Sequence, residues 1–248
     1  MPQTIVIEKV VYKYDELDER AQEQAYEKWA ENALDYEWWD CSYDDFEQVA
    51  EALGIMMSKK RGNSPDIWFS GFWSQGDGLC FTGQMELKDM AGAVKRIKAY
   101  ASIDKELHQI AKDIESVYSE FMKESSRCAK HGEVKNLKEY LLQYGISVQI
   151  TGHDRGYYET VELYGDPYSS ELDEYMGTAK SLLGEDMGLQ EIDFDILEDG
   201  VKEIANDFSH WMYRTLEKEY EYGTSKESFK ESCEANDYTF SESGHFEY

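Results

Sequence analysis

Few side chains in this sequence have both the chemistry and the spacing expected of a catalytic site. Asp77 lies in a Gly-Asp-Gly turn, and His153 precedes Asp154 in a second glycine-flanked turn. If the two turns lay side by side, Asp77, His153 and Tyr158 could share a cleft and act in acid–base chemistry. Asp is also an ordinary turn residue, and a histidine in a turn needs no special role. A small enzyme with a cleft near these turns is therefore one hypothesis, and a structural role for these residues is the favoured alternative.

Other common site chemistries have no matching sequence pattern. The histidines are scattered, at His108, His131, His153, His210 and His245. The sequence has no EF-hand loop, no HExxH motif and no phosphate-binding glycine loop, so we expect no dedicated metal site and no cofactor. The cysteines Cys41, Cys80, Cys128 and Cys233 lack zinc-like spacing and predict free thiols, two of them buried. Cys80, among aromatic residues, is expected to be a small buried side chain rather than a nucleophile.

The Asp77 turn belongs to an aromatic segment that predicts a β-hairpin. Aromatic and β-branched residues favour strands, and Gly-Asp-Gly favours a tight turn. The predicted strands are 67–73 and 79–85, and the predicted turn between them is 74–78. Alternation of side chains then gives two faces, with Ile67, Phe69 and Trp73 on one and Trp68 and Phe72 on the other. A hairpin that is aromatic on both faces is either covered on both or carries a binding surface.

The remaining elements are predicted from hydrophobic periodicity. A second hairpin is expected from 146–150 and 157–163 around the turn 152–156, and further strands are expected at 4–12 and 238–240. Helices are expected at 15–33, 42–53, 87–100, 136–144, 199–222 and 224–233, with another running to 121 from a cap at Ser102 or Asp104. The mixed order predicts the α+β class, an antiparallel sheet built from two hairpins and packed with several amphipathic helices. We expect one domain over 1–248, with a surface insertion at 165–190.

The charge of the chain limits its partners. There are 25 Lys and Arg against 52 Asp and Glu, a net charge of −27. Such a chain repels nucleic-acid phosphate and anionic membranes, so we expect no direct nucleic-acid binding and no membrane association. Without a signal-peptide pattern, the start of the sequence predicts a cytoplasmic protein. Residues 15–53 carry 14 acidic side chains against 2 basic ones, and residues 191–248 carry 16 against 5. These acidic ends also permit mimicry of DNA, whose phosphates supply one charge per ~1.7 Å.

Several segments resemble a widespread group of phage and prophage proteins. The matching pieces are 67–83, 100–111, 211–222 and 234–240, whereas the region 130–190 departs from the pattern. Some members of that group carry the label of an antitoxin from a toxin–antitoxin stability system. The group has no established activity and no catalytic residues. The resemblance implies a phage accessory protein that acts inside the bacterial cytoplasm.

The leading hypothesis is a phage-encoded protein that binds and modulates a host protein through an acidic, aromatic-bearing surface. The expected partner is basic or DNA-binding, and association would be sensitive to salt. Trp68, Phe72 and Trp73 are the candidate anchors, with Gln75 and Asp77 at the hairpin tip, because aromatic side chains dominate binding hot spots. Burial of Trp68 and Phe72 in the monomer would argue against this role. The alternatives are an acidic DNA mimic that inhibits a DNA-binding protein, and the small enzyme described above.

Overall fold

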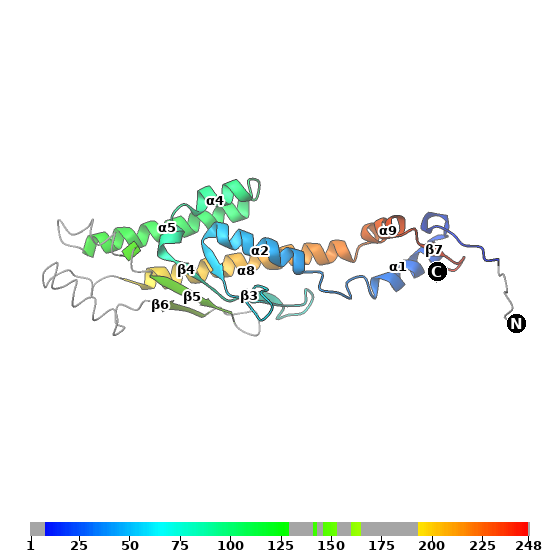
Figure 1. Ribbon diagram of the computed structural model, residues 1–248, viewed down its shortest axis with the longest axis horizontal. Coiled ribbons are helices and arrows are strands. Elements are labelled where there is room, and N and C mark those ends of the chain that lie inside the picture. The colour runs from blue at the N-terminus through cyan, green and yellow to red at the C-terminus, as the bar shows by residue number, and fades with distance from the viewer. Residues whose placement is uncertain (1–7, 129–140, 143–145, 153–159, 165–192, 248) are drawn as a thin grey trace. The chain divides into compact units, whose positions relative to one another are not determined.

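The computed structural model describes residues 8–128, 141–142, 146–152, 160–164 and 193–247 (Figure 1). It confirms the α+β class, because helices and antiparallel strands both occur and the strands pair only antiparallel to one another in the described part. The chain divides into two compact units. The terminal unit is formed by Met1–Asp40 and Leu216–Tyr248, and the central unit by Cys41–Thr215. A single domain over 1–248 stays a prediction. The insertion at 165–190 and the turn residue His153 lie outside the described residues.

A four-stranded antiparallel sheet organises the central unit. Its strands, in spatial order, are β1 (Ile55–Met57), β4 (Gly83–Glu86), β5 (Ser147–Thr151) and β6 (Thr160–Tyr164). The pair β5–β6 confirms the second predicted hairpin, with Val148 opposite Leu163 and Ile150 opposite Val161. One face of the sheet is apolar and buried, through Ile55, Met57, Met85, Val148 and Ile150.

The aromatic hairpin forms a separate two-stranded sheet, β2 (Ile67–Ser70) with β3 (Gly78–Phe81). Its register pairs Ile67 with Phe81 and Phe69 with Leu79, so these side chains share a face as predicted. The predicted strands 67–73 and 79–85 were too long. The first ends at Ser70, and the second is interrupted at Thr82, after which the chain enters the four-stranded sheet as β4. The single sheet expected from two hairpins is therefore two sheets.

The interruption at Thr82 has a backbone cause. The N–H of Thr82 donates to the carbonyl of Asp66 over 2.9 Å, and the carbonyl of Thr82 accepts from the N–H of Ser58 over 2.8 Å. The N–H of Asp66 in turn donates to the carbonyl of Ser58, also over 2.8 Å. Three chain segments thus meet in a closed ring of hydrogen bonds, here called the Thr82 junction. The N–H and the carbonyl of Thr82 bond to two different segments of the chain, and Thr82 therefore divides the predicted strand into β3 and β4.

Helices complete the core of the central unit (Figure 1). They are α2 (Asp40–Leu53), α3 (Leu87–Met90), α4 (Ala93–Tyr100), α5 (Lys105–Cys128) and α8 (Asp195–Gly223), the last of which continues into the terminal unit. Asp104 caps α5, as one of the two predicted caps, because its Oδ1 accepts from the N–H groups of Glu106 and Leu107. The single helix expected over 87–100 is two helices, since Gly92 adopts φ +81° between them.

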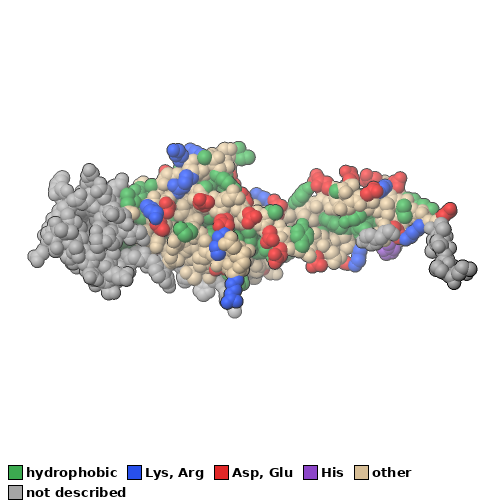
Figure 2. Space-filling model, in the orientation of Figure 1, with side chains coloured by type: hydrophobic (Ala, Val, Ile, Leu, Met, Phe, Trp, Pro, Cys, Tyr) green, Lys and Arg blue, Asp and Glu red, His purple; other side chains and the backbone are tan. Residues whose placement is uncertain are grey.

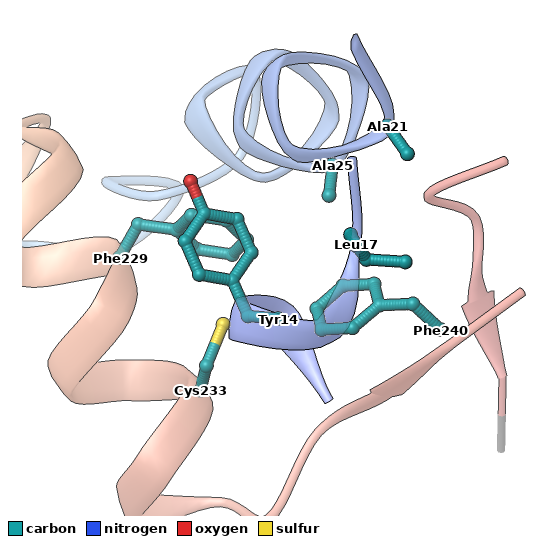
Figure 3. Packing of buried hydrophobic residues seen from close by; sticks show 7 residues of the cluster. All are labelled: Tyr14, Leu17, Ala21, Ala25, Phe229, Cys233 and Phe240. Carbon is teal, nitrogen blue, oxygen red and sulfur yellow. The ribbon is translucent and has the colours of Figure 1, made fainter. Parts of the chain in front are cut away.

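The terminal unit packs around Phe229. Its elements are a 3-10 turn (Tyr14–Glu16), α1 (Glu19–Ala30), α9 (Lys226–Ala235), β7 (Thr239–Phe240) and β8 (Phe246–Glu247). Figure 3 shows the buried cluster, which comprises Tyr14, Leu17, Ala21, Ala25, Phe229, Cys233 and Phe240. The ring centroid of Phe229 lies 5.0 Å from that of Tyr14 and 5.1 Å from that of Trp29. Aromatic side chains from both ends of the chain thus stabilise this unit.

Two local expectations for the terminal unit need correction. The helix expected from residue 15 begins later: the N-cap of α1 is Asp18, whose side chain accepts from the N–H of Ala21, and Asp15 lies in the preceding 3-10 turn. Of the predicted strand 4–12, residues 8–12 are described, and among them only Tyr12 forms a bridge, to Phe240. The predicted start of the last helix at 224 is close to the observed one, because the hydroxyl of Ser225 accepts from the N–H of Ser228 and caps α9.

The described cysteines differ in burial in a way that predicts their reactivity. Cys41 is exposed and Cys80 and Cys233 are buried, and all three are free thiols, as predicted. Burial raises the pKa of the Cys233 thiol to about 11, so at pH 8 this thiol is protonated, and the thiolate is the form that reacts.

We expect iodoacetamide at pH 8 to alkylate Cys41 in the native protein while Cys233 remains unmodified, as read by mass spectrometry of peptides. In concentrated urea both should react. Equal rates for the two residues in the native protein would contradict this placement of Cys233.

Candidate functional site

Asp77 organises the loop that joins β2 to β3. Its Oδ2 accepts hydrogen bonds from the backbone N–H groups of Trp73, over 2.9 Å, and Ser74, over 2.6 Å. The carboxylate also lies against Gly71, where an added Cβ would come within 2.8 Å of Oδ2. The structure thus gives Asp77 a loop-stabilising role. Its predicted catalytic partners His153 and Tyr158 lie outside the described residues, so their pairing stays a prediction.

Phe72 and Tyr213 fasten this loop to helix α8. Phe72 is half-buried, with its ring centroid 6.0 Å from that of Phe69 in a stacked pair and 5.3 Å from that of Tyr213. The hydroxyl of Tyr213 donates to the carbonyl of Gly71 over 2.9 Å. Phe72 therefore packs the loop against Phe69 and Tyr213. The next residue in the loop, Trp73, is 73% exposed to solvent.

Trp68 lies on β2 and is held in place by two neighbours. Its side chain is 51% exposed, and its indole N–H donates to Oδ1 of Asp66 over 3.0 Å. The ammonium group of Lys60 lies 3.9 Å from the centroid of the ring and also donates to the carbonyl of Ile67. A cation above an exposed tryptophan ring stabilises the contact by about 0.5–1 kcal/mol. The indole is thus both accessible and oriented.

The predicted anchors therefore separate into two groups. Trp68, Trp73 and the tip residue Gln75 are exposed, whereas Phe72 and Asp77 are half-buried. The prediction that Trp73 shares a face with Ile67 was wrong, because the strand ends at Ser70 and Trp73 lies in the loop. We refer to Trp68 and Trp73 with their supporting contacts as the aromatic surface. That it anchors a partner stays a prediction.

The aromatic surface is not itself acidic. From Ser58 to Met85 the charged residues are Lys59, Lys60, Arg61, Asp66 and Asp77. Lys59 forms an ion pair with Glu47 of α2, and Lys60 lies 3.7 Å from a carboxylate oxygen of Asp66. The acidic side chains are concentrated elsewhere. In the terminal unit, 20 Asp and Glu stand against 7 Lys and Arg, and Figure 2 shows carboxylates gathered over its helices.

A groove beside β1 is a feature that the sequence analysis missed. It encloses about 530 Å³ between α2, β1 and the α3–α4 segment, and its lining includes Glu47, Glu51, Met56, Lys59, Asp89 and Arg96. We call it the β1 groove. No local signal marks it, because its residues come from segments up to 50 positions apart and none of them forms a recognisable motif.

Within the described part of the chain, no three His, Cys, Asp or Glu side chains are grouped closely enough to hold a metal ion. No described helix is long and apolar enough to cross a membrane. The described site thus consists of aromatic side chains, their supporting hydrogen bonds and a charged groove. Aromatic side chains are enriched at protein interfaces, and concave sites commonly hold ligands.

Fold and site together define an α+β protein with an exposed aromatic hairpin. The chain belongs to a family described as a domain of unknown function, DUF8835, whose model matches residues 38–226. No curated protein and no solved structure matches it. The matched span contains the whole central unit, whereas α1, β7 and β8 of the terminal unit lie outside it.

Proposed function

We propose that this chain is a phage-encoded accessory protein that binds and modulates a protein of the bacterial host in its cytoplasm. The observation that carries the proposal is the aromatic surface, on which Trp68 and Trp73 are 51% and 73% exposed. Trp is enriched among the few interface residues that supply most of the binding energy. Both indoles belong to one hairpin, five positions apart in the sequence, and exposed apolar patches are typical of protein-binding surfaces.

The order of the aromatic surface supports the same function. Asp77 fixes the loop backbone, Tyr213 ties the loop to α8, and Lys60 and Asp66 orient Trp68. A surface that is ordered before binding loses less conformational entropy when a partner docks. The hydrogen bonds of this loop therefore favour binding as well as folding.

The charge distribution indicates the kind of partner. A net charge of −27 attracts a basic protein over long range and raises its rate of association at low salt. The aromatic surface carries nearly balanced charge, so docking of the two indoles does not bury a group of unpaired carboxylates. In this proposal the acidic side chains steer the partner, and the aromatic side chains hold it.

The phage assignment rests on the resemblance of 67–83, 100–111, 211–222 and 234–240 to phage and prophage proteins.

A second candidate, mimicry of DNA, is favoured by the acidic excess of the terminal unit, with 20 acidic against 7 basic side chains. The two candidates differ in one respect. Duplex DNA would displace the partner of a DNA mimic, because both compete for the same basic site.

The test is capture of partners from a bacterial lysate with tagged protein, read by mass spectrometry, followed by titration of the captured partner. Trp68→Ala together with Trp73→Ala should weaken binding by about 2 kcal/mol or more, roughly 30-fold, because hot-spot side chains contribute that much. Ile103→Ala is the matched control, since Ile103 is a 91% exposed apolar residue of the same unit outside the hairpin. Equal affinity of the double tryptophan variant and the wild type would refute the aromatic surface as the anchor.

A further inference from the structure

The β1 groove has the size and position of a peptide-binding site. Its volume of about 530 Å³ lies within the usual range for ligand sites, about 300–1,000 Å³. It runs beside β1, which pairs only with β4 among the described strands and is therefore an edge of the sheet. Sheet edges and the grooves beside them are common places for extended segments of another protein to bind.

Both cationic side chains of the groove are already engaged. Arg96 donates from Nε to the carbonyl of Ala52 over 2.9 Å and from Nη1 to that of Ala91 over 2.8 Å, and it also bonds to the carbonyl of Asp89. Arg96 thus binds the C-terminal end of α2 and the α3–α4 connection. Lys59 forms its ion pair with Glu47. Both cationic side chains are thus held by contacts within the protein.

The carboxylates of the groove differ in whether they form an ion pair. Glu47 is paired with Lys59, whereas Glu51 and Asp89 form no ion pair with any described residue. Glu51 is exposed and Asp89 half-buried. Apolar contact area is supplied by Met56, which is 57% exposed and lies on β1 between the buried residues Ile55 and Met57. The groove therefore combines two carboxylates that form no ion pair within the described part of the chain with a flexible thioether, a side chain that adapts to varied partners.

We propose that the β1 groove binds a short segment of the partner that carries a lysine or arginine beside an apolar side chain. The cationic group lies between the carboxylates of Glu51 and Asp89, and the apolar side chain packs on Met56. Charge complementarity selects this occupant, because the cations of the groove are bound internally and its two unpaired groups are both acidic. The inference rests on the proposed function in one respect, namely that the natural partner is a basic protein.

The test uses short fluorescent peptides and the full chain. One peptide alternates leucine with lysine, and a matched one alternates leucine with glutamate. The lysine peptide should bind the wild type, as measured by fluorescence anisotropy, and the glutamate peptide should not. Glu51→Gln combined with Asp89→Asn should weaken binding about tenfold or more, because each change removes a charge-assisted contact. Met56→Gln, which leaves the charge unchanged, should weaken it several-fold.

A charge-matched control separates the groove from general attraction to an acidic protein. Glu120→Gln with Glu203→Gln removes two exposed carboxylates of the same unit, outside the groove, and should leave peptide affinity nearly unchanged. Equal weakening by the two double variants, or equal binding of the two peptides, would overturn the proposal. A different result would contradict the proposed function. If the partner still binds after Trp68 and Trp73 are replaced, the aromatic surface is wrong even when the groove binds the lysine peptide.

Discussion

Phe229→Ala is expected to unfold the terminal unit while the central unit stays folded. Phe229 is fully buried, and its ring contacts those of Tyr14, Trp29 and three further aromatic residues. Truncating a buried phenylalanine costs about 3–5 kcal/mol. A small unit with one hydrophobic cluster has little stability beyond that amount, since whole domains have only about 5–15 kcal/mol.

Hydrogen exchange read by mass spectrometry tests this expectation region by region. In Phe229→Ala the amides of α1 and α9 should lose protection, while those of α5 and the β2–β3 hairpin keep it. Tyr36→Ala is the control, because it removes an exposed aromatic ring from the same unit. Loss of protection throughout the chain would show that the two units unfold together.

Gly54→Ala is expected to destabilise the central unit strongly. Gly54 ends α2 with φ +89°, and a Cβ there would lie 2.5 Å from the carbonyl oxygen of Asp89. The left-handed backbone costs about 1–2 kcal/mol for a residue with a side chain. The close contact adds about 1–3 kcal/mol, as overpacking does in a core, since a backbone oxygen cannot rotate away.

Gly62→Ala separates these two costs. Gly62 has φ +99°, similar to Gly54, but nothing lies within 4 Å of a Cβ at this position. It should therefore incur the backbone cost alone. Urea denaturation of both variants, compared with wild type, gives the cost of the close contact as the difference in the free energy of unfolding. If the two variants are equally stable, the approach of Gly54 to Asp89 is looser than described.

The features that the sequence predicted correctly depend on nearby residues. The end of the helix predicted at 42–53 and the cap Asp104 before α5 both depend on residues within a few positions of the backbone groups that they serve. The alternation of Ile67, Trp68 and Phe69 likewise needed only the pleat of a strand, and their burial confirms it up to Ser70, where β2 ends.

The features that the sequence did not reveal depend on distant segments. The Thr82 junction requires Ser58, Asp66 and Thr82 together, and no pattern around Thr82 shows where a strand changes partners. The exposure of Trp73 follows from the end of β2 at Ser70 and from the contact of the loop with Tyr213 on α8. The β1 groove is similar, because its lining residues come together only where the end of α2 contacts the α3–α4 segment.

The terminal unit is built from two segments that lie far apart in the sequence, and this separation determines when the unit can fold during synthesis. Helix α1 packs against Phe229 and its neighbours in α9, which the ribosome adds much later. At about 5–20 residues per second, the roughly 200 residues between α1 and α9 take about 10–40 s to synthesise. During that interval the side chains of α1 that pack in the terminal cluster, Ala21, Ala25 and Trp29, lack their partners from α9. A nascent chain thus exposes these side chains of α1 to solvent until α9 has been synthesised.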